Sequence, residues 1–235
     1  MRDFKDIKIV ASFPAHDDDK WIDKVLDNLS LYTNEIYINL NDATPYIKKV
    51  VKNHPKVIKW IETTNNGNRW SQGKVRDDTI RMLDDIQPDI VLAPDSDETY
   101  PNNLMEMLKE FWEDEQKRTF WFRLYYMHED EDHIRNDGIW KTIHHVRAFK
   151  WEPGLTFIKY AGYACPTEYI NLPRVTKYHS KVPNFHWGYM LTDDRQRKFI
   201  RAGEKHNYHN EEYRNVVDKN MIIHEITPEI KKLID

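Results

Sequence analysis

Residues 90–98 read Ile-Val-Leu-Ala-Pro-Asp-Ser-Asp-Glu, an apolar run that ends in a proline and a group of carboxylates. Pro88 and Pro94 bound the run, which is too short for a helix and is typical of a strand buried on both faces. Strands of this kind form parallel sheets, and ligands of such sheets bind outside the carboxyl ends of the strands. The stretch therefore predicts both the type of sheet and the place where chemistry occurs.

The sequence before this stretch repeats the same arrangement of strand and helix. Apolar runs at 7–13, 36–40 and 57–61 predict three more strands, and residues 19–32 carry apolar side chains at helical spacing. Further helices are predicted after Thr44-Pro45, over 75–86 and from Pro101. Four strand–helix pairs in a row predict an α/β fold, with a doubly wound and mostly parallel sheet flanked by helices.

The second half of the chain follows a less regular pattern. Residues 120–127 predict an aromatic strand, 128–133 an acidic loop and 139–160 one or two further strands. A helix is predicted over 192–202, and a final helix or strand over 219–233. No linker separates the halves, so we expect 1–115 and 116–235 to form one domain.

Composition narrows the classes of protein that are possible. The 235 residues include 35 Lys and Arg against 39 Asp and Glu, which gives a net charge of −4 and argues against a general nucleic-acid coat. A single cysteine fits a reducing compartment. The N-terminus lacks the apolar segment of a secretory signal, and no apolar run approaches the roughly 18 residues of a membrane span. We therefore expect a cytoplasmic protein without a membrane span.

Asp95 and Asp97 are the sharpest candidates for chemistry. Residues i and i+2 of an extended backbone point to the same side, so the two carboxylates could hold one cation. Oxygen ligands suit Mg²⁺ or Mn²⁺ rather than zinc. The alternative is a solvated acidic turn before the helix at Pro101.

Three further segments accompany these aspartates in a fixed order. Residues 39–44 end the second predicted strand with Asn-Leu-Asn-Asp-Ala-Thr, and residues 70–77 read Trp-Ser-Gln-Gly-Lys-Val-Arg-Asp before a helix and the aspartate strand. Residues 186–189 read His-Trp-Gly-Tyr and precede a basic helix. In this order the segments resemble the family 2-like glycosyltransferases with a GT-A fold, and the resemblance covers most of 7–205.

The resemblance implies a metal-dependent glycosyltransferase, a hexosyl- or pentosyltransferase that inverts the transferred sugar. The donor would be a nucleotide sugar, with UDP as the expected nucleotide, and the acceptor would be a hydroxyl. Residues 1–115 would bind the nucleotide sugar and 116–235 the acceptor. The cofactor would be Mn²⁺ or Mg²⁺, which offsets the charge of the diphosphate leaving group.

The resemblance also assigns roles to residues. Asp97 would be the direct metal ligand, Asp95 would hold the ribose or join the metal shell, and His186 would complete that shell or contact the diphosphate. His186 could instead be a hydrogen-bonded core histidine. The implied donor nucleotide site comprises Phe13, Ala15, Asn41, Asp42, Lys74, Arg76 and Asp95.

Two features of the implied donor site stay open. An exposed helix surface is the alternative for Lys74 and Arg76. The family usually has an acidic residue at the end of its second strand, where this chain has Asn39, Asn41 and Asp42. Asparagine can pair with a pyrimidine edge, but the choice of nucleotide is left open.

An inverting transfer needs a general base for the acceptor hydroxyl, and two residues are candidates. Glu168 lies where the family places a histidine–glutamate pair, although Thr167 replaces the histidine. Asp130 lies in the predicted acidic loop, for which a solvated turn is the alternative.

Other functions remain as alternatives. A non-catalytic domain that binds nucleotide or carbohydrate fits the altered motif at Thr167, whereas a nucleotidyltransferase is disfavoured because residues 12–16 contain no glycine. The expected acceptor is a saccharide. The basic residues of 195–205 leave hydroxymethylated bases in viral DNA as another acceptor. The sequence does not indicate the sugar, the acceptor or the oligomeric state.

Overall fold

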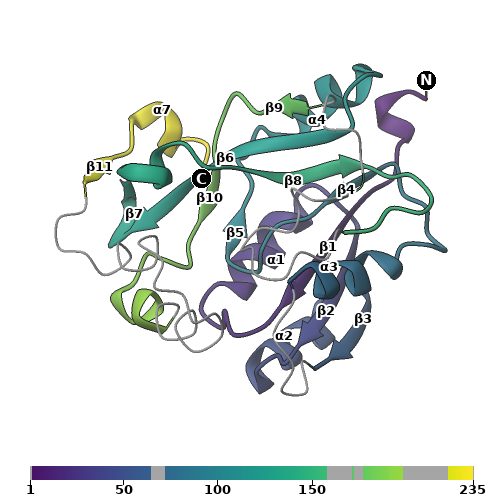
Figure 1. Ribbon diagram of the computed structural model, residues 1–235, viewed down its shortest axis with the longest axis horizontal. Coiled ribbons are helices and arrows are strands. Elements are labelled where there is room, and N and C mark those ends of the chain that lie inside the picture. Colours follow the sequence, from purple (N-terminus) through teal and green to yellow (C-terminus); the bar gives the residue numbers. More distant parts are fainter. Residues whose placement is uncertain (1, 65–71, 158–170, 172–176, 198–221, 235) are drawn as a thin grey trace.

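The computed structural model describes residues 2–64, 72–157, 171, 177–197 and 222–234 (Figure 1). Its strands form an eleven-stranded mixed sheet in which helices cover both faces. The sheet order β11-β7-β6-β8-β4-β1-β2-β3 places the parallel strands of the first half beside the antiparallel strands of the second. The expected α/β class and the mostly parallel first half are confirmed.

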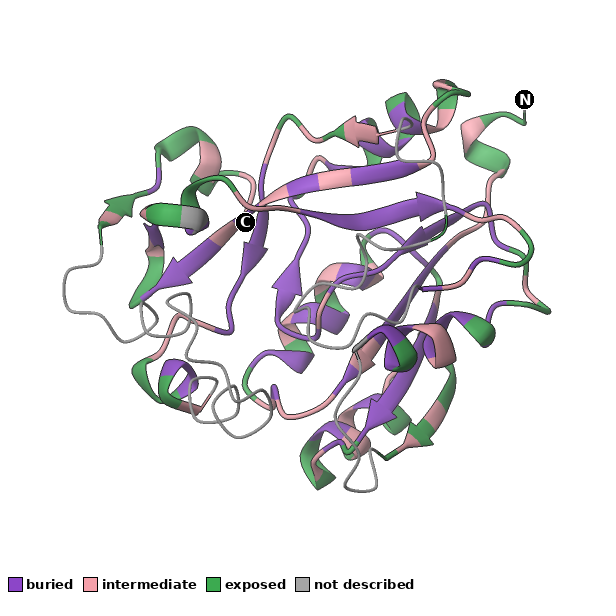
Figure 2. Cartoon of the chain, viewed as in Figure 1, coloured by how far each residue is buried: buried purple, intermediate pink, exposed green. Residues whose placement is uncertain are grey.

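The first half supplies four parallel strands. They are β1 (Ile9–Ala15), β2 (Glu35–Asn41), β3 (Val57–Thr63) and β4 (Ile90–Leu92). β1 pairs with β2 on one side and with β4 on the other, and β2 pairs with β3. The central strands β1 and β4 are almost wholly buried, which explains their continuous apolar sequence (Figure 2).

Four helices alternate with these strands. α1 (Ile22–Ser30), α2 (Pro45–Asn53) and α4 (Leu104–Glu113) pack on one face of the sheet, and α3 (Gln72–Arg81) packs on the other. Thr44 caps α2 as predicted, because its hydroxyl accepts a hydrogen bond from the amide of Ile47.

The second half extends the sheet with antiparallel strands. β8 (His144–Lys150) pairs with β4, β6 (Thr119–His128) pairs with β8, and β7 (Asp130–Arg135) pairs with β6. β11 (Ile223–Glu225) adds to β7. The pairing of β4 with β8 thus joins the strands of the two halves in one continuous sheet.

Three short strands complete the sheet. β5 (Glu98–Thr99) pairs with β10 (Asn184–His186), which also pairs with β6. β9 (Lys177–His179) pairs with β6. The remaining elements are the 3₁₀ helices η1 (Phe4–Asp6) and η2 (Gly138–Lys141), a helix over 192–197 and α7 (Pro228–Lys231). No helix of the described residues combines the length and the hydropathy that a membrane crossing requires.

The structure corrects three expectations. The acidic segment 128–133 is a tight hairpin rather than a loop: Glu129, at φ 71°, turns β6 directly into β7. The helix expected from Pro101 begins at Leu104. Residues 95–98 form a turn, closed by the hydrogen bond from the Glu98 amide to the Asp95 carbonyl (3.1 Å), rather than extended backbone.

Candidate nucleotide and metal site

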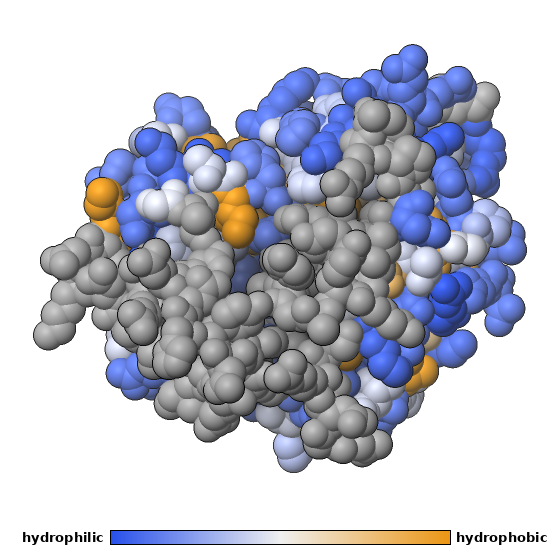
Figure 3. Space-filling model, in the orientation of Figure 1, coloured by the Kyte–Doolittle hydropathy of each residue, from blue (hydrophilic) through white to orange (hydrophobic). Residues whose placement is uncertain are grey.

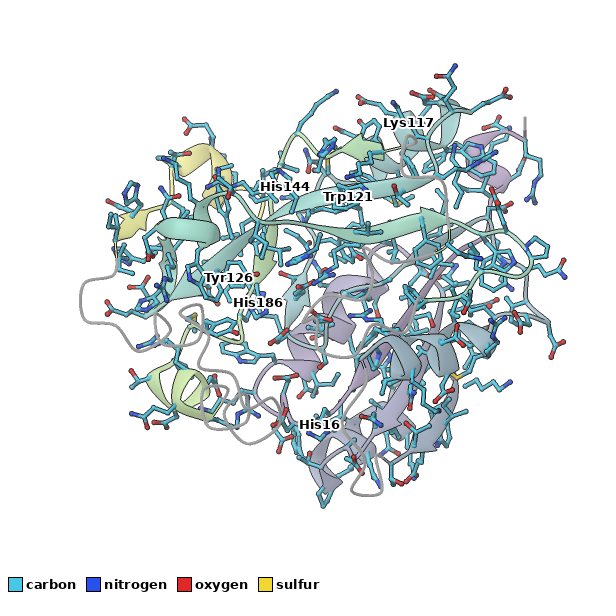
Figure 4. All side chains as sticks on the ribbon, viewed as in Figure 1. His16, Lys117, Trp121, Tyr126, His144 and His186 are labelled. Carbon is cyan, nitrogen blue, oxygen red and sulfur yellow. The ribbon has the colours of Figure 1, made fainter. Side chains whose placement is uncertain are left out.

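The carboxyl ends of β1 and β2 are joined by hydrogen bonds from the loops that follow them. His16 donates through Nδ1 to the carbonyl of Asn41 (2.6 Å), and the amide of Thr44 donates to the carbonyl of His16 (3.1 Å). Figure 4 shows His16 at this end of the sheet. The two loops therefore form one connected rim at the edge of the sheet where ligands of such sheets bind.

The residues expected to face the nucleoside lie along this rim. Phe13 and Ala15 are buried at the end of β1, and Asn41 is buried at the end of β2. The Asn41 side-chain amide donates to the hydroxyl of Thr63 (2.9 Å), while Asp42 is exposed and has a left-handed φ of 48°. Asp42 thus reaches solvent, whereas the side chains of Phe13, Ala15 and Asn41 are buried.

Four charged side chains meet at the end of β4, and we call Arg76, Asp95, Glu98 and Arg147 the carboxylate network. Arg76 of α3 and Arg147 of β8 contact opposite oxygens of Asp95, with Arg147 Nη2 2.8 Å from Oδ2. Arg147 also contacts both oxygens of Glu98, at 2.6 Å from Nη2 to Oε1. Arg76 further donates to the carbonyls of Ala93 (3.3 Å) and Pro94 (3.1 Å).

Burial and charge act in opposite directions on the two acids of this network. Burial disfavours ionisation of Asp95, but Arg147 and Arg76 outweigh it and hold the pKa of Asp95 well below its usual range. Glu98 is completely buried, and burial raises its pKa to about 7 although Arg147 opposes the rise. Two arginines are needed here because Asp95 and Glu98 would otherwise repel each other.

Asp97 lies in the same turn but has different neighbours. The amide of Trp187 donates to the Asp97 carbonyl (2.8 Å), and His186 Nε2 is 3.6 Å from Asp97 Oδ1. Both side chains are buried, and the pairing of β5 with β10 brings them together. Because residues 95–98 turn, the expectation that Asp95 and Asp97 point to the same side of an extended strand is wrong.

A divalent ion fits the donor set that Asp97 and His186 supply. A carboxylate with an imidazole suits Mn²⁺, and an ion of this kind takes its other ligands from substrate phosphates and water. Among the described residues, no group of three or more His, Cys, Asp or Glu side chains is arranged to hold a metal ion. Asp97 and His186 would thus be two ligands from the described part of the chain, and phosphate oxygens and water would add to the shell.

Aromatic side chains surround His186. The ring of Tyr126 lies 4.8 Å from the imidazole and that of Tyr189 lies 5.1 Å from it, between ring centroids. Trp140 packs edge-on against both tyrosines, at 4.4 and 5.2 Å. Figure 4 shows Tyr126 and His186 adjacent on neighbouring strands. These contacts fix the orientation of the imidazole beside Asp97.

The other candidates are placed less centrally or lie outside the described part of the chain. Lys74 is exposed on α3 and forms an ion pair with Asp78. Asp130 is exposed at the start of β7, where His133 contacts it at 2.7 Å and lowers its pKa. Glu168 lies outside the described residues, as does most of the segment over 158–176.

Sequence reasoning missed two parts of this site. Arg147 lies between Val146 and Ala148 in the predicted strand, and a buried arginine requires an acidic partner, so this was a usable signal. Asp18 accepts a hydrogen bond from the hydroxyl of Ser96 (2.6 Å) and lies 3.5 Å from Arg197. That contact joins the β1 loop to the aspartate turn across 78 residues, and no local pattern predicts it.

Comparison with known proteins identifies the fold by its similarity to solved structures. No family model matches the chain, and no curated protein matches its sequence. Solved structures do match: TarS 1–349 of S. aureus covers 90% of this chain at 12% identity, with a TM-score of 0.51, and the chain covers 69% of it. The same TarS fragment in complex with UDP-GlcNAc matches at 13% identity, with a TM-score of 0.50, 90% of this chain and 70% of that one.

A longer TarS structure shows how much of that protein this chain matches. It matches over 90% of this chain at 12% identity with a TM-score of 0.53, but this chain covers only 42% of it. TarS 1–349 has also been crystallised with UDP. These likenesses concern the arrangement of strands and helices over nearly the whole chain, and they establish that the chain has the GT-A fold of glycosyltransferases.

Proposed function

We propose that this chain is a metal-dependent glycosyltransferase that transfers a sugar from a nucleotide-sugar donor, a UDP-sugar, to an acceptor hydroxyl with inversion. The observation that carries the proposal is the Asp97–His186 pair, which lies beside the carboxylate network at the end of β4. The GT-A fold and the crystal structures of TarS with UDP and UDP-GlcNAc support it.

The proposed roles follow from the contacts of each side chain. Asp97 and His186 would hold Mn²⁺ or Mg²⁺, and the ion would offset the charge that develops on the departing diphosphate. Arg76 and Arg147 already bind both oxygens of Asp95, so we assign Asp95 to the ribose or the outer metal shell rather than to direct ligation. Asn41 and Asp42 would lie beside the nucleobase of the donor.

The acceptor hydroxyl must lose a proton as it attacks the sugar. Of the two candidate bases, Asp130 is disfavoured because the hydrogen bond from His133 lowers its pKa and weakens it as a base. Glu168 is therefore the proposed base. Asp130→Asn should consequently retain transferase activity, whereas Glu168→Gln should lose it.

The first test is thermal stability with UDP and UDP-sugars, with and without Mn²⁺. A ligand present at about 100 times its dissociation constant adds roughly 2.7 kcal/mol to the folded state, which corresponds to a shift of about 5–10 °C for a chain of this size. We expect the shift to require Mn²⁺, to reverse with EDTA and to disappear in Asp97→Asn.

A matched control separates the site from a general loss of charge. Asp85→Asn removes one exposed carboxylate after α3 and should leave the shift intact. A metal-independent shift, or one that survives in Asp97→Asn, would contradict the proposed metal site. A metal-dependent shift without sugar transfer or donor hydrolysis would favour the alternative of a non-catalytic nucleotide-binding domain.

A further inference from the structure

A second cluster of charged residues lies outside the proposed site, on one face of β9, β6 and β8. The register places His179 beside Trp121, and His144 beside Arg123. Side chains that pair across strands, and those two residues apart on one strand, share a face. We call Trp121, Arg123, His144, Lys177 and His179 the basic face.

Ring and cation–π contacts link four of the five side chains of the basic face, and Arg123 shares the face through its register with His144. The ammonium of Lys177 lies 3.8 Å from the ring centre of Trp121, and the ring of His179 lies 6.2 Å from the same tryptophan. The imidazoles of His144 and His179 are 5.7 Å apart, although β6 separates their strands. The two histidines therefore lean toward each other across β6, and Figure 4 labels His144 beside Trp121.

The basic side chains of this face lack acidic partners among the described residues. In the described part of the chain, no carboxylate forms an ion pair with Arg123, Lys177 or His179. Nearby acids are engaged elsewhere, since Glu110 pairs with Lys181 and Glu152 with Arg118. The Nε of Arg123 is buried without a hydrogen-bond acceptor, although its Nη2 donates to Asn136 (3.2 Å).

The electrostatic effect is visible at His179. Burial lowers the pKa of its imidazole, and His144, Lys177 and Lys117 lower it further. Every charge that shifts this group is thus positive. The chain has a net charge of −4, and other described surface lysines have acidic partners, as Lys48 and Lys52 have in Glu62.

We propose that the basic face is a binding site for a ligand that carries several phosphate groups in a chain. A guanidinium forms charge-assisted hydrogen bonds with phosphate, and an ammonium adds a point charge. Neighbouring strands are about 4.8 Å apart, so the ammonium of Lys177 on β9, the guanidinium of Arg123 on β6 and the imidazole of His144 on β8 lie on strands that span about 10 Å across the sheet. A single phosphate cannot contact that whole width, whereas a phosphate chain can.

The side chains are accessible to such a ligand. His179 is exposed, and Trp121, Arg123, His144 and Lys177 are each half-buried. Figure 3 shows hydrophilic atoms at the surface over the upper part of the molecule where β6 and β8 run. Trp121 holds Lys177 in place through the cation–π contact and adds to the site only in that way.

The test uses the full chain in EDTA, so that binding through a divalent ion is excluded. Orthophosphate, tripolyphosphate and long-chain polyphosphate are titrated calorimetrically at low and moderate salt. We expect affinity to rise with chain length and to fall steeply with salt, because binding releases counterions. If orthophosphate bound as tightly as tripolyphosphate and polyphosphate, the proposal of a site for several phosphate groups would be wrong. If tripolyphosphate bound as tightly as polyphosphate, the natural ligand would be short. If polyphosphate bound more tightly than tripolyphosphate, the ligand would be a polymer.

Two double variants with equal change in net charge localise the binding. Arg123→Gln with Lys177→Gln should lower polyphosphate affinity at least about tenfold, since charged hydrogen bonds contribute about 1.5–3 kcal/mol each. Lys48→Gln with Lys52→Gln should change it less than about twofold. Equal losses in both variants, or no loss in the first, would overturn the proposal. Melting curves verify that both variants fold.

Two further measurements separate this site from the proposed nucleotide site. Asp97→Asn should bind polyphosphate as the parent chain does, because Asp97 is not part of the basic face. In histidine-labelled protein, polyphosphate should shift the imidazole resonances of His144 and His179 and leave that of His186 in place. A shift confined to His186 would instead assign the phosphate binding to the nucleotide site.

Discussion

At the end of β4, each charged side chain of the carboxylate network contacts a group of opposite charge, and Arg147 alone contacts both Asp95 and Glu98. On the basic face, Arg123 and Lys177 have no such partner within the described residues, and the groups that lower the pKa of His179 there, His144, Lys177 and Lys117, are all basic. Arg76, Glu98 and Arg147 of the carboxylate network are buried and Asp95 is half-buried, whereas the basic face reaches solvent.

The difference follows from what water can do at each place. A buried charge without a partner loses its hydration and destabilises the fold by several kcal/mol, so the fold must supply opposite charges within the network. A half-exposed cation keeps much of its hydration, and repulsion between such cations is weak. Pairing inside the fold therefore indicates a structural role, while unpaired cations at the surface are available to a ligand.

The largest effect that this comparison predicts is at Arg147. Arg147→Met leaves Glu98 buried without its cation and Asp95 with one arginine in place of two, so we expect the free energy of unfolding to fall by about 3–5 kcal/mol. Urea denaturation at pH 7 measures the loss.

The matched control is Arg81→Met on α3. Its guanidinium lies 3.5 Å from Asp77 and is 42% exposed, so its removal should cost less than about 1 kcal/mol. A loss of similar size in both variants would show that burial does not distinguish the two arginines. Adding Glu98→Gln to Arg147→Met should recover part of the stability, because it removes the unpaired charge.

The same contrast explains how much of the molecule could be predicted. The buried strands β1, β2 and β4 were predictable because continuous apolar runs between turn residues leave few alternatives. β5, β9 and β10 have two or three residues each, too few for any periodicity, and they exist only because β6 and one another offer pairing edges.

The site was predictable where local sequence determines it. The aspartate turn follows its strand directly, so its position could be read from residues 90–98 alone. The partners of Asp95 could not, because Arg76 and Arg147 come from 19 and 52 residues away. The basic face has the same origin: its five residues come from three segments, and only strand pairing gathers them.

His128 tests the comparison through pH. Its side chain is 2% exposed, and burial together with Arg195 and Arg135 lowers its pKa to about 4, while Glu129 and Asp137 oppose the shift. A lowered pKa means that the unfolded chain binds a proton which the folded chain excludes between about pH 6.5 and 4. The contribution of His128 to the free energy of unfolding should therefore be fully present above pH 6.5. It should decrease as the pH is lowered, by up to about 3 kcal/mol near pH 4.

Other acids titrate in this range, so the measurement is a difference between two proteins. His128→Gln removes the titrating group, and its unfolding free energy should fall less steeply from pH 6.5 to 4.5 than that of the parent. His133→Gln is the control, because Asp130 raises the pKa of the exposed His133 and its pH dependence has the opposite sign. Parallel curves for parent and His128→Gln would mean that His128 is hydrated.

The smallest effect is expected on the basic face itself. Lys177→Gln removes a half-exposed cation, so stability should change by no more than about 0.5 kcal/mol. The pKa of His179 should nevertheless rise toward that of a free imidazole, because Lys177 is one of the cations that lower it. An NMR titration of the His179 ring measures this shift, with Lys181→Gln as a control, since Lys181 is already paired with Glu110. An unchanged His179 pKa would mean that Lys177 does not act on this imidazole, and the basic face would then lack the concentrated positive potential that a phosphate chain requires.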